Sequence, residues 1–142
     1  MIRIELMSWD AARAQASPIR FTVFVEEQRV PVEIEWDDQD EKSIHALAYD
    51  KQGTAIATGR LLPDGHIGRM AVLKEWRGKG VGAAILRRLI GVARERGDQE
   101  IELFAQTHAI EFYRRHGFVE QGEIFEEAGI PHQAMRKRLS EQ

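Results

Sequence analysis

Several features that mark other classes of protein are missing from this sequence of 142 residues. It contains no cysteine, which excludes disulfide bonds and cysteine nucleophiles. Its formal net charge is −3, so no excess of basic residues favours a nucleic-acid partner. No apolar run approaches the length that crosses a membrane, and the first residues form no apolar signal region. We therefore expect a cytoplasmic protein that binds neither nucleic acid nor a membrane.

What the sequence does contain is typical of one folded domain. Hydrophobic residues make up 43% of the chain, and we expect residues 1–142 to form a single domain. Apolar segments predict strands over seven ranges, namely 2–6, 44–49, 54–62, 66–72, 101–105, 118–125 and 132–139. Helical spacing predicts helices from residue 9, over 81–96 and over 108–116, and Pro18 either interrupts the first helix or starts another. This order predicts an α+β fold around one mixed, mostly antiparallel sheet flanked by helices.

One glycine-rich stretch lies between a predicted strand and a predicted helix. It consists of Arg77, Gly78, Lys79, Gly80, Val81 and Gly82. Helix amides without intrahelical partners, the helix dipole and two cationic side chains predict a cradle for an anion such as phosphate. A P-loop would need Lys-Ser or Lys-Thr where this chain has Ala83 and Ala84, and the G-x-G-x-G spacing differs from the dinucleotide fingerprint. A tight turn that starts a helix without any ligand is the alternative.

An acidic segment, Glu33–Glu41, has two interpretations. It could attract a cationic amine and supply a carboxylate as a general base, or it could be a solvated loop with Trp36 as its anchor. A calcium site is a poor match because the segment lacks the glycine and the distal glutamate of an EF-hand loop. We expect no metal.

Two motifs resemble the GNAT superfamily of N-acetyltransferases. Residues 77–82 match its R/Q-x-x-G-x-G/A signature, and a second motif follows in the family's order and spacing as Ala109, Phe112-Tyr113 and Gly117-Phe118. Residues 23–28 (VFVEEQ) and 129–132 (GIPH) resemble the ElaA-like branch, which includes relatives called YjcF. The resemblance covers nearly the whole chain. It implies a GNAT-like fold in which the sheet is splayed between its strands around an acetyl-CoA site.

The resemblance implies acetyl-CoA binding at particular positions of this chain. Backbone groups of Met70, Ala71 and Val72 would pair with the pantetheine arm, and one of these amides would stabilise the oxyanion of a tetrahedral intermediate. The amides of residues 78–82 would hold the pyrophosphate. Gln106 stands near the position where many relatives carry asparagine, and it would contact the pantetheine arm. The second motif would complete the binding site with Ala109, Phe112 and Tyr113.

The implied reaction is transfer of an acetyl group to a primary amine by direct attack in a ternary complex. Tyr113 occupies the position of a general acid in many relatives, and the candidates for a general base are Glu27, Glu33 and His132, in no order. The acceptor would be a small-molecule or peptide amine, and an acidic site would favour polyamines, a lysine side chain or a protein N-terminus. A non-catalytic acyl-CoA-binding or sensing module is the alternative. A homodimer is compatible with the resemblance.

Overall fold

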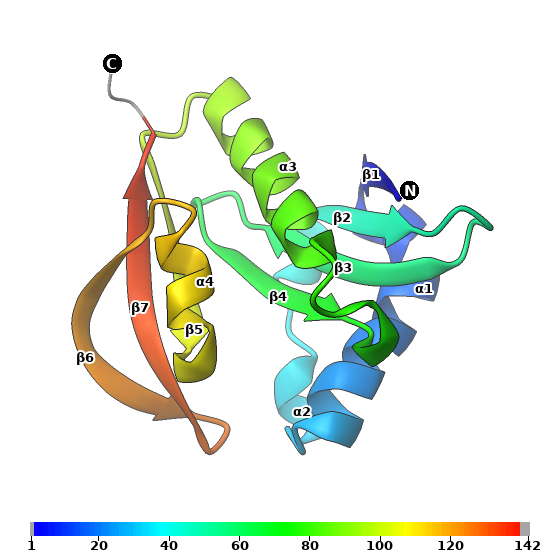
Figure 1. Ribbon diagram of the computed structural model, residues 1–142, viewed down its shortest axis with the longest axis horizontal. Helices are drawn as coiled ribbons and strands as arrows, with labels where there is room; N and C mark the ends of the chain where they lie inside the picture. The colour runs from blue at the N-terminus through cyan, green and yellow to red at the C-terminus, as the bar shows by residue number, and fades with distance from the viewer. Residues whose placement is uncertain (1, 140–142) are drawn as a thin grey trace.

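The strands form two antiparallel sheets that meet at one end of the molecule (Figure 1). The computed structural model describes residues 2–139. Its first sheet has the order β1-β2-β3-β4, formed by β1 (Arg3–Met7), β2 (Ile44–Tyr49), β3 (Ala55–Leu61) and β4 (Ile67–Val72). Its second sheet has the order β5-β7-β6, formed by β5 (Glu100–Gln106), β6 (Val119–Glu127) and β7 (Ile130–Arg138). The seven strands that the sequence predicts are all confirmed.

The two sheets are joined where β4 begins. Within the described residues, one parallel bridge pairs His66 with Glu102, and the Glu102 amide donates to the Gly65 carbonyl at 3.1 Å. Beyond this bridge β4 and β5 diverge, as Figure 1 shows in the centre of the view. The predicted α+β fold, splayed between its central strands, is confirmed. The expectation of one continuous sheet is corrected to two sheets linked by a bridge.

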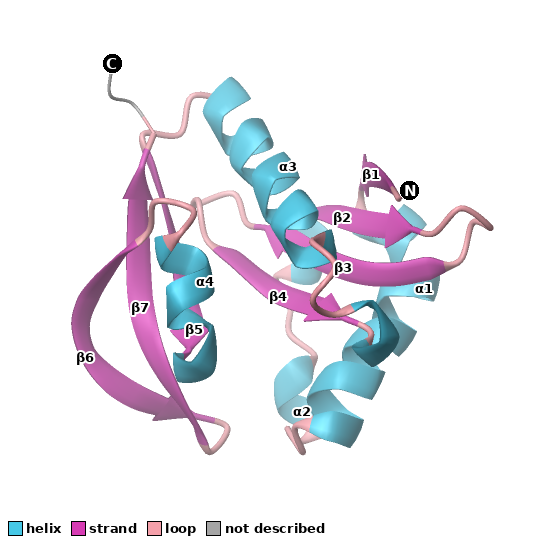
Figure 2. Cartoon of the chain, in the orientation of Figure 1, coloured by secondary structure: helices cyan, strands magenta, loops and turns pink. Residues whose placement is uncertain are grey.

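Helices cover the two faces of the sheets (Figure 2). One face of the first sheet packs against α3 (Val81–Glu95). On the same side of the molecule, α4 (Ile110–Arg114) and the short η4 (Thr107–Ala109) lie over β5 of the second sheet. The other face of the first sheet packs against α1 (Trp9–Arg20), which continues into the π-helical η1 (Phe21–Glu27). Shorter helices connect these elements, namely α2 (Val32–Glu35), η2 (Asp40–Lys42) and η3 (Lys74–Trp76). None of the helices in residues 2–139 combines the length and the apolar character needed to span a membrane.

Pro18 neither ends the first helix nor begins a second one. The helix runs through Pro18 and changes to wider turns three residues later, where the Gln28 amide reaches back five residues to the Val23 carbonyl at 3.1 Å. Proline lacks an amide hydrogen and crowds the preceding turn, so a helix that retains it loses one hydrogen bond. π-helical turns are rare in proteins, and where they occur they often lie at functional sites. Here the wide turns direct Val23 and Phe24 towards the gap between the sheets.

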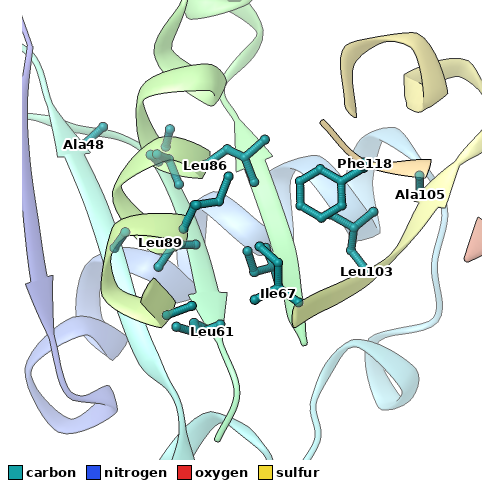
Figure 3. Packing of buried hydrophobic residues seen from close by; sticks show 14 of the residues in the cluster. Ala48, Leu61, Ile67, Leu86, Leu89, Leu103, Ala105 and Phe118 are labelled. Atoms are coloured by element: carbon teal, nitrogen blue, oxygen red, sulfur yellow. The ribbon is translucent and has the colours of Figure 1, made fainter. Parts of the chain in front are cut away.

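The larger core lies between α3 and the sheets. The apolar face that the sequence predicts for α3 is buried at every position, namely Val81, Ile85, Leu86, Leu89, Ile90 and Ala93. Figure 3 shows Leu86 and Leu89 beside Leu61 and Ile67. The same cluster continues through Leu103 to Phe118, so it holds the two sheets together above the gap. We call this side of both sheets the α3 face, and the opposite side the α1 face.

Candidate active site

The gap between β4 and β5 opens into a cleft of about 960 Å³ that residues from both sheets line. Successive side chains along a strand point to opposite faces of the sheet, so the strands beside the gap contribute side chains to the cleft on both the α3 face and the α1 face. Leu103 packs in the core of the α3 face, which directs Phe104 to the α1 face. The same alternation directs Arg60 to the α1 face, because Leu61 packs in the core. The volume suits a small-molecule ligand or cofactor, whose sites are commonly 300–1,000 Å³.

The glycine-rich loop forms the end of the cleft on the α3 face. Gly78 and Gly80 have φ values of 76° and 84°, a left-handed conformation that glycine adopts without steric cost. The first hydrogen bond of α3 joins the Ala84 amide to the Gly80 carbonyl at 3.1 Å. The preceding amides of the helix therefore have no acceptor within it. Val81, Gly82 and Ala83 line the cleft, whereas Lys79 is exposed and does not line it.

Arg77 fixes this loop to the elements around it. Its Nε donates to the Val72 carbonyl at 2.9 Å, and its Nη2 pairs with Glu27 Oε1 at 2.5 Å. The loop is therefore tied to the end of β4 and to η1 at once. These contacts occupy much of the guanidinium, so the free amides of the loop remain the main donors for an anion.

The edge of β4 that faces the gap has backbone groups outside the pairing with β3, and Arg77 Nε takes the Val72 carbonyl among them. The Leu73 amide donates to the Ile56 carbonyl of β3 at 3.0 Å, so the backbone groups of Val72 point the other way, towards the gap. Earlier in the strand, the register shifts so that Arg69 and Met70 together lie opposite Gly59. This bulge leaves Arg69 at a φ of 50°. Met70, Ala71 and Val72 all line the cleft, as an extended ligand beside β4 requires.

Tyr113 lies on α4, in the wall on the α3 face. Its ring packs at centroid distances of 5.0 Å from Phe112 and 5.9 Å from Phe118. Burial raises the pKa of Tyr113 to about 12. Among residues 2–139 the structure records no hydrogen bond to its hydroxyl. Tyr113 therefore keeps its proton at neutral pH and can act as a donor in the cleft, which Ala109 and Phe112 also line.

The three candidates for a general base have different surroundings. Glu27 is paired with Arg77, and neither Glu27 nor the exposed Glu33 lines the cleft. His132 does line it. Its Nδ1 lies 2.7 Å from the Ile130 carbonyl, which can only accept, so the proton is assigned to Nδ1 and Nε2 keeps its lone pair. The residue opposite His132 in the register is Gln106, which shares the α1 face with Phe104.

Sequence reasoning missed a bridge of side chains across the mouth of the gap. The amide of Gln106 on β5 donates to Gln28 Oε1 at 2.8 Å, and His108 Nε2 lies 2.8 Å from Gln106 Oε1. Gln28 follows η1, so this contact links the two halves of the cleft. Gln28 belongs to residues 23–28, which resemble the ElaA-like branch, and this resemblance could have pointed to Gln28 as a residue of the site. The Gln106 amide is thus already oriented in the wall, and all three residues line the cleft.

The acidic segment is held by arginines rather than by Trp36. The prediction that Trp36 anchors the segment is wrong, because its exposed fraction is 63%. Three of its carboxylates instead pair with three arginines, in contacts between Arg20 and Glu35, Arg20 and Asp40, Arg60 and Asp37, Arg60 and Asp40, and Arg69 and Asp37. The expectation of a wholly solvated loop is therefore also wrong, since Glu35 and Asp40 are buried.

The ion pairs alter the electrostatics of this end of the cleft. Burial alone would raise the pKa of Asp37, but the hydrogen bond and charge of Arg60 and the charge of Arg69 outweigh it and lower the pKa to about 2. The carboxylates of Glu35, Asp37 and Asp40 are matched by three guanidinium groups. These three acids therefore supply little net negative charge to attract a cationic amine.

The chain is similar to known proteins over most of its length. The family model described as an acetyltransferase (GNAT) domain matches residues 11–139. The chain belongs to the GNAT family. It is 39% identical to YjcF of Bacillus subtilis (strain 168), named as an uncharacterized N-acetyltransferase, over 84% of this chain and 87% of that protein. It is 32% identical to ElaA of Escherichia coli (strain K12), over 85% of this chain and 84% of that protein.

Solved structures of this family have the same architecture. The crystal structure of an acyl-CoA N-acyltransferase from Pseudomonas aeruginosa matches with a TM-score of 0.86 and 29% identity, over 96% of this chain and 99% of that one. The crystal structure of Escherichia coli ElaA matches with a TM-score of 0.86 and 27% identity, over 97% of this chain and 100% of that one. This GNAT protein is an acetyl-CoA-dependent N-acetyltransferase. The predicted family, its ElaA-like branch and the acyl donor are confirmed.

Proposed function

We propose that this GNAT protein transfers the acetyl group directly to a primary amine, with His132 as general base and Tyr113 as proton donor to the leaving sulfur. The observation that carries the proposal is the separation of these two groups. His132 lines the cleft on the α1 face, whereas Tyr113 and the glycine-rich loop line it on the α3 face. An acyl donor that lies in the gap would have a base on one side and an acid on the other.

The glycine-rich loop is the proposed site for the pyrophosphate of acetyl-CoA. Free amides at the start of α3 and the helix dipole suit a dianionic group. The exposed edge of β4 is the proposed site for the pantetheine arm, which would pair with the backbone near Val72. An amide that faces the gap, that of Val72 or Met70, would then donate to the thioester oxygen, where one such donor contributes roughly 3–4 kcal/mol in comparable sites.

His132 is the proposed acceptor of a proton from the amine. An alkylammonium group has a pKa of about 10.4, so a primary amine must lose a proton before it can attack a thioester. The contact between Nδ1 and the Ile130 carbonyl leaves Nε2 free to take this proton, directly or through a water molecule. The new bond joins nitrogen to the acetyl carbon, and the bond that breaks is the carbon–sulfur bond. The products are an N-acetylated amine and free coenzyme A.

Tyr113 is the proposed donor to the departing sulfur. Its pKa of about 12 keeps the phenol protonated, but it also makes the phenol a weaker acid than a thiol, whose pKa is about 8.5. We therefore propose that Tyr113 stabilises the thiolate mainly by a hydrogen bond as the carbon–sulfur bond lengthens. A thiolate is a good leaving group, so this assistance is small compared with the removal of the proton from the amine.

Steady-state rates as a function of pH test the assignment of the base. Free coenzyme A is measured with a thiol reagent for the wild type, for His132→Gln and for Glu33→Gln as the matched control. We expect His132→Gln to lower kcat/KM at pH 7 roughly a hundredfold or more, and the rate to recover in part as the pH rises and more of the amine is free. The Kd for acetyl-CoA, measured by calorimetry, should not change. An unchanged kcat/KM at pH 7 in His132→Gln would reject this residue as the base.

The oligomeric state and the location in the cell stay predictions. A homodimer would have twice the chain mass of 16.3 kDa, which light scattering of the purified protein measures directly.

A further inference from the structure

A row of aromatic rings runs along the α1 face of the second sheet. The ring centroids of His66 and Phe104 are 5.4 Å apart, those of Phe104 and Phe125 are 5.5 Å apart, and those of Phe125 and His132 are 5.9 Å apart. Phe104 has an exposed fraction of 48%, although it lines the cleft. A large apolar ring that is half exposed inside a cleft is a surface that a ligand can cover.

The wall across the cleft carries an arginine whose bonds are incomplete. Arg69 donates through Nε and Nη2 to the carbonyl of Glu35 at 3.3 and 3.0 Å, and through Nη2 to Asp37 at 3.2 Å. Within residues 2–139 the structure records no partner for its Nη1. The neighbouring Arg60 is 5% exposed, also lines the cleft, and has an Nε without a hydrogen-bond partner. The Nε of Arg60 is enclosed by protein atoms, so Arg69 is the arginine of this wall that has a donor for a ligand.

The charges around Arg69 favour an additional anion. Burial and then the positive charge of Arg60 lower the pKa of Arg69, and they outweigh the opposing charges of Asp37 and Glu35. The nearby carboxylates are already shared with Arg20 and Arg60. A carboxylate from a ligand would add an acceptor for the Nη1 of Arg69, and the planar guanidinium suits the geometry of a carboxylate.

We propose that the acceptor is a free amino acid with an aromatic side chain, whose ring packs on Phe104 and whose carboxylate pairs with Arg69. The inference rests on the proposed function, because it names the substrate class of the same site. An acceptor held by these two walls presents its α-amine between them, on the face where His132 lies. Polyamines, which the acidic segment favoured in the sequence, lack both the ring and the anion that these walls recognise.

Three matched acceptors separate the contributions of the ring and the carboxylate. L-Phenylalanine has both groups, 2-phenylethylamine lacks the carboxylate, and L-alanine lacks the ring. With acetyl-CoA as donor and thiol release as the readout, we expect kcat/KM for L-phenylalanine to exceed that of either analogue by roughly ten- to a hundredfold. Spermidine, the polyamine in the panel, should be poorer than L-phenylalanine.

Two variants test the assignment of the residues through ratios within each variant. Arg69→Gln should lower the ratio of kcat/KM for phenylalanine to kcat/KM for phenylethylamine about tenfold or more. Only phenylalanine loses a contact in this variant, because phenylethylamine has no carboxylate to pair with Arg69. Phe104→Ala should lower the ratio of phenylalanine to alanine. General damage to the bulge at Arg69 affects both acceptors alike and cancels in the ratio. The controls Arg138→Gln and Ile124→Ala change exposed residues outside the cleft, and both ratios should stay at their wild-type values.

The outcomes distinguish this inference from the proposed function. Turnover of spermidine or 2-phenylethylamine at or above the rate of L-phenylalanine would overturn the amino-acid acceptor and leave amine acetylation standing. Unchanged ratios in both Arg69→Gln and Phe104→Ala would also overturn it. If acetyl-CoA binds in calorimetry but none of the four amines is acetylated, the amino-acid acceptor is overturned, whereas the roles of His132 and Tyr113 are tested by their own variants.

Discussion

The left-handed backbone at Gly80 provides a sharp test of the loop. Gly80 has a φ of 84°, and a Cβ built at this position meets no atom within 4 Å. Gly80→Ala therefore changes the backbone energy without a steric clash. The left-handed conformation costs a residue with a Cβ roughly 1–2 kcal/mol. The smaller entropy of alanine in the unfolded chain offsets about 0.4–1 kcal/mol of this cost.

The net effect of Gly80→Ala is a loss of about 1 kcal/mol in the free energy of unfolding. For a domain of this size it corresponds to a decrease in Tm of roughly 3–5 °C. If the variant loop instead relaxes to another conformation, acetyl-CoA must restore the left-handed one. The same energy then appears as a Kd for acetyl-CoA that is roughly fivefold higher. Thermal unfolding and calorimetric titration together measure both forms of the loss.

Gly82→Ala is the matched control for this prediction. Gly82 lies in the first turn of α3, and its added Cβ would be 3.5 Å from Val72 Cγ2 and 3.9 Å from Phe112 Cζ, which are ordinary contacts. Alanine in a helix is favoured over glycine by roughly 0.5–1 kcal/mol, so Tm should stay constant or rise. Equal losses in both variants, or none in Gly80→Ala, would refute the argument from backbone conformation.

Three further substitutions have distinct expected results. Tyr113→Phe should lower kcat about tenfold, because the leaving sulfur loses a donor, and should leave the Kd for acetyl-CoA unchanged. Thiol release measures kcat and calorimetry measures the Kd. An unchanged kcat would contradict the role of Tyr113 as a donor. Glu27→Gln should weaken acetyl-CoA binding roughly two- to fivefold, because Arg77 loses an exposed ion pair but keeps the Val72 carbonyl. A hundredfold lower kcat in this variant would instead identify Glu27 as the base. Asp37→Asn should lower the free energy of unfolding at pH 7 by about 1–2 kcal/mol. The pKa of Asp37 in the folded state lies below the ordinary 3.8, so its stabilisation exists above pH 4 and disappears as the pH falls towards 2. Urea unfolding at pH 7 and near pH 2 should therefore show that the difference in stability between wild type and variant becomes smaller at the lower pH.

The sequence predicted well where a local pattern has one low-energy outcome. The apolar spacing of α3 and the glycine that follows it defined that helix to within one residue of its end. The apolar segments likewise located β6 and β7 to within two residues at each end. Predictions failed where long-range charge pairs compete with local signals. Trp36 looked like an anchor, but the contacts that order its segment come from Arg20 and Arg60, whose partners no local pattern identifies.

The candidate site divides in the same way. The motif from Arg77 to Gly82 was sufficient to predict an anion cradle, because free amides at a helix start are a local property of the chain. Local sequence also placed Tyr113 on a short helix, but only packing against Phe112 and Phe118 sets its environment and hence its pKa. The tertiary structure alone separated His132 from the other base candidates.

What the sequence by itself determined about this protein is its family, its order of strands and helices, and the glycine-rich loop that we propose as the site of the acyl donor. These depend on periodicity, turn residues and motifs, whose energies come from neighbours along the chain. What the tertiary structure decided is the chemistry of the wall that we propose for the acceptor. There Arg69 and Phe104 come from different strands, and they face one cleft because β4 and β5 diverge after the bridge at His66. That divergence depends on pairing between distant segments, which no local pattern encodes.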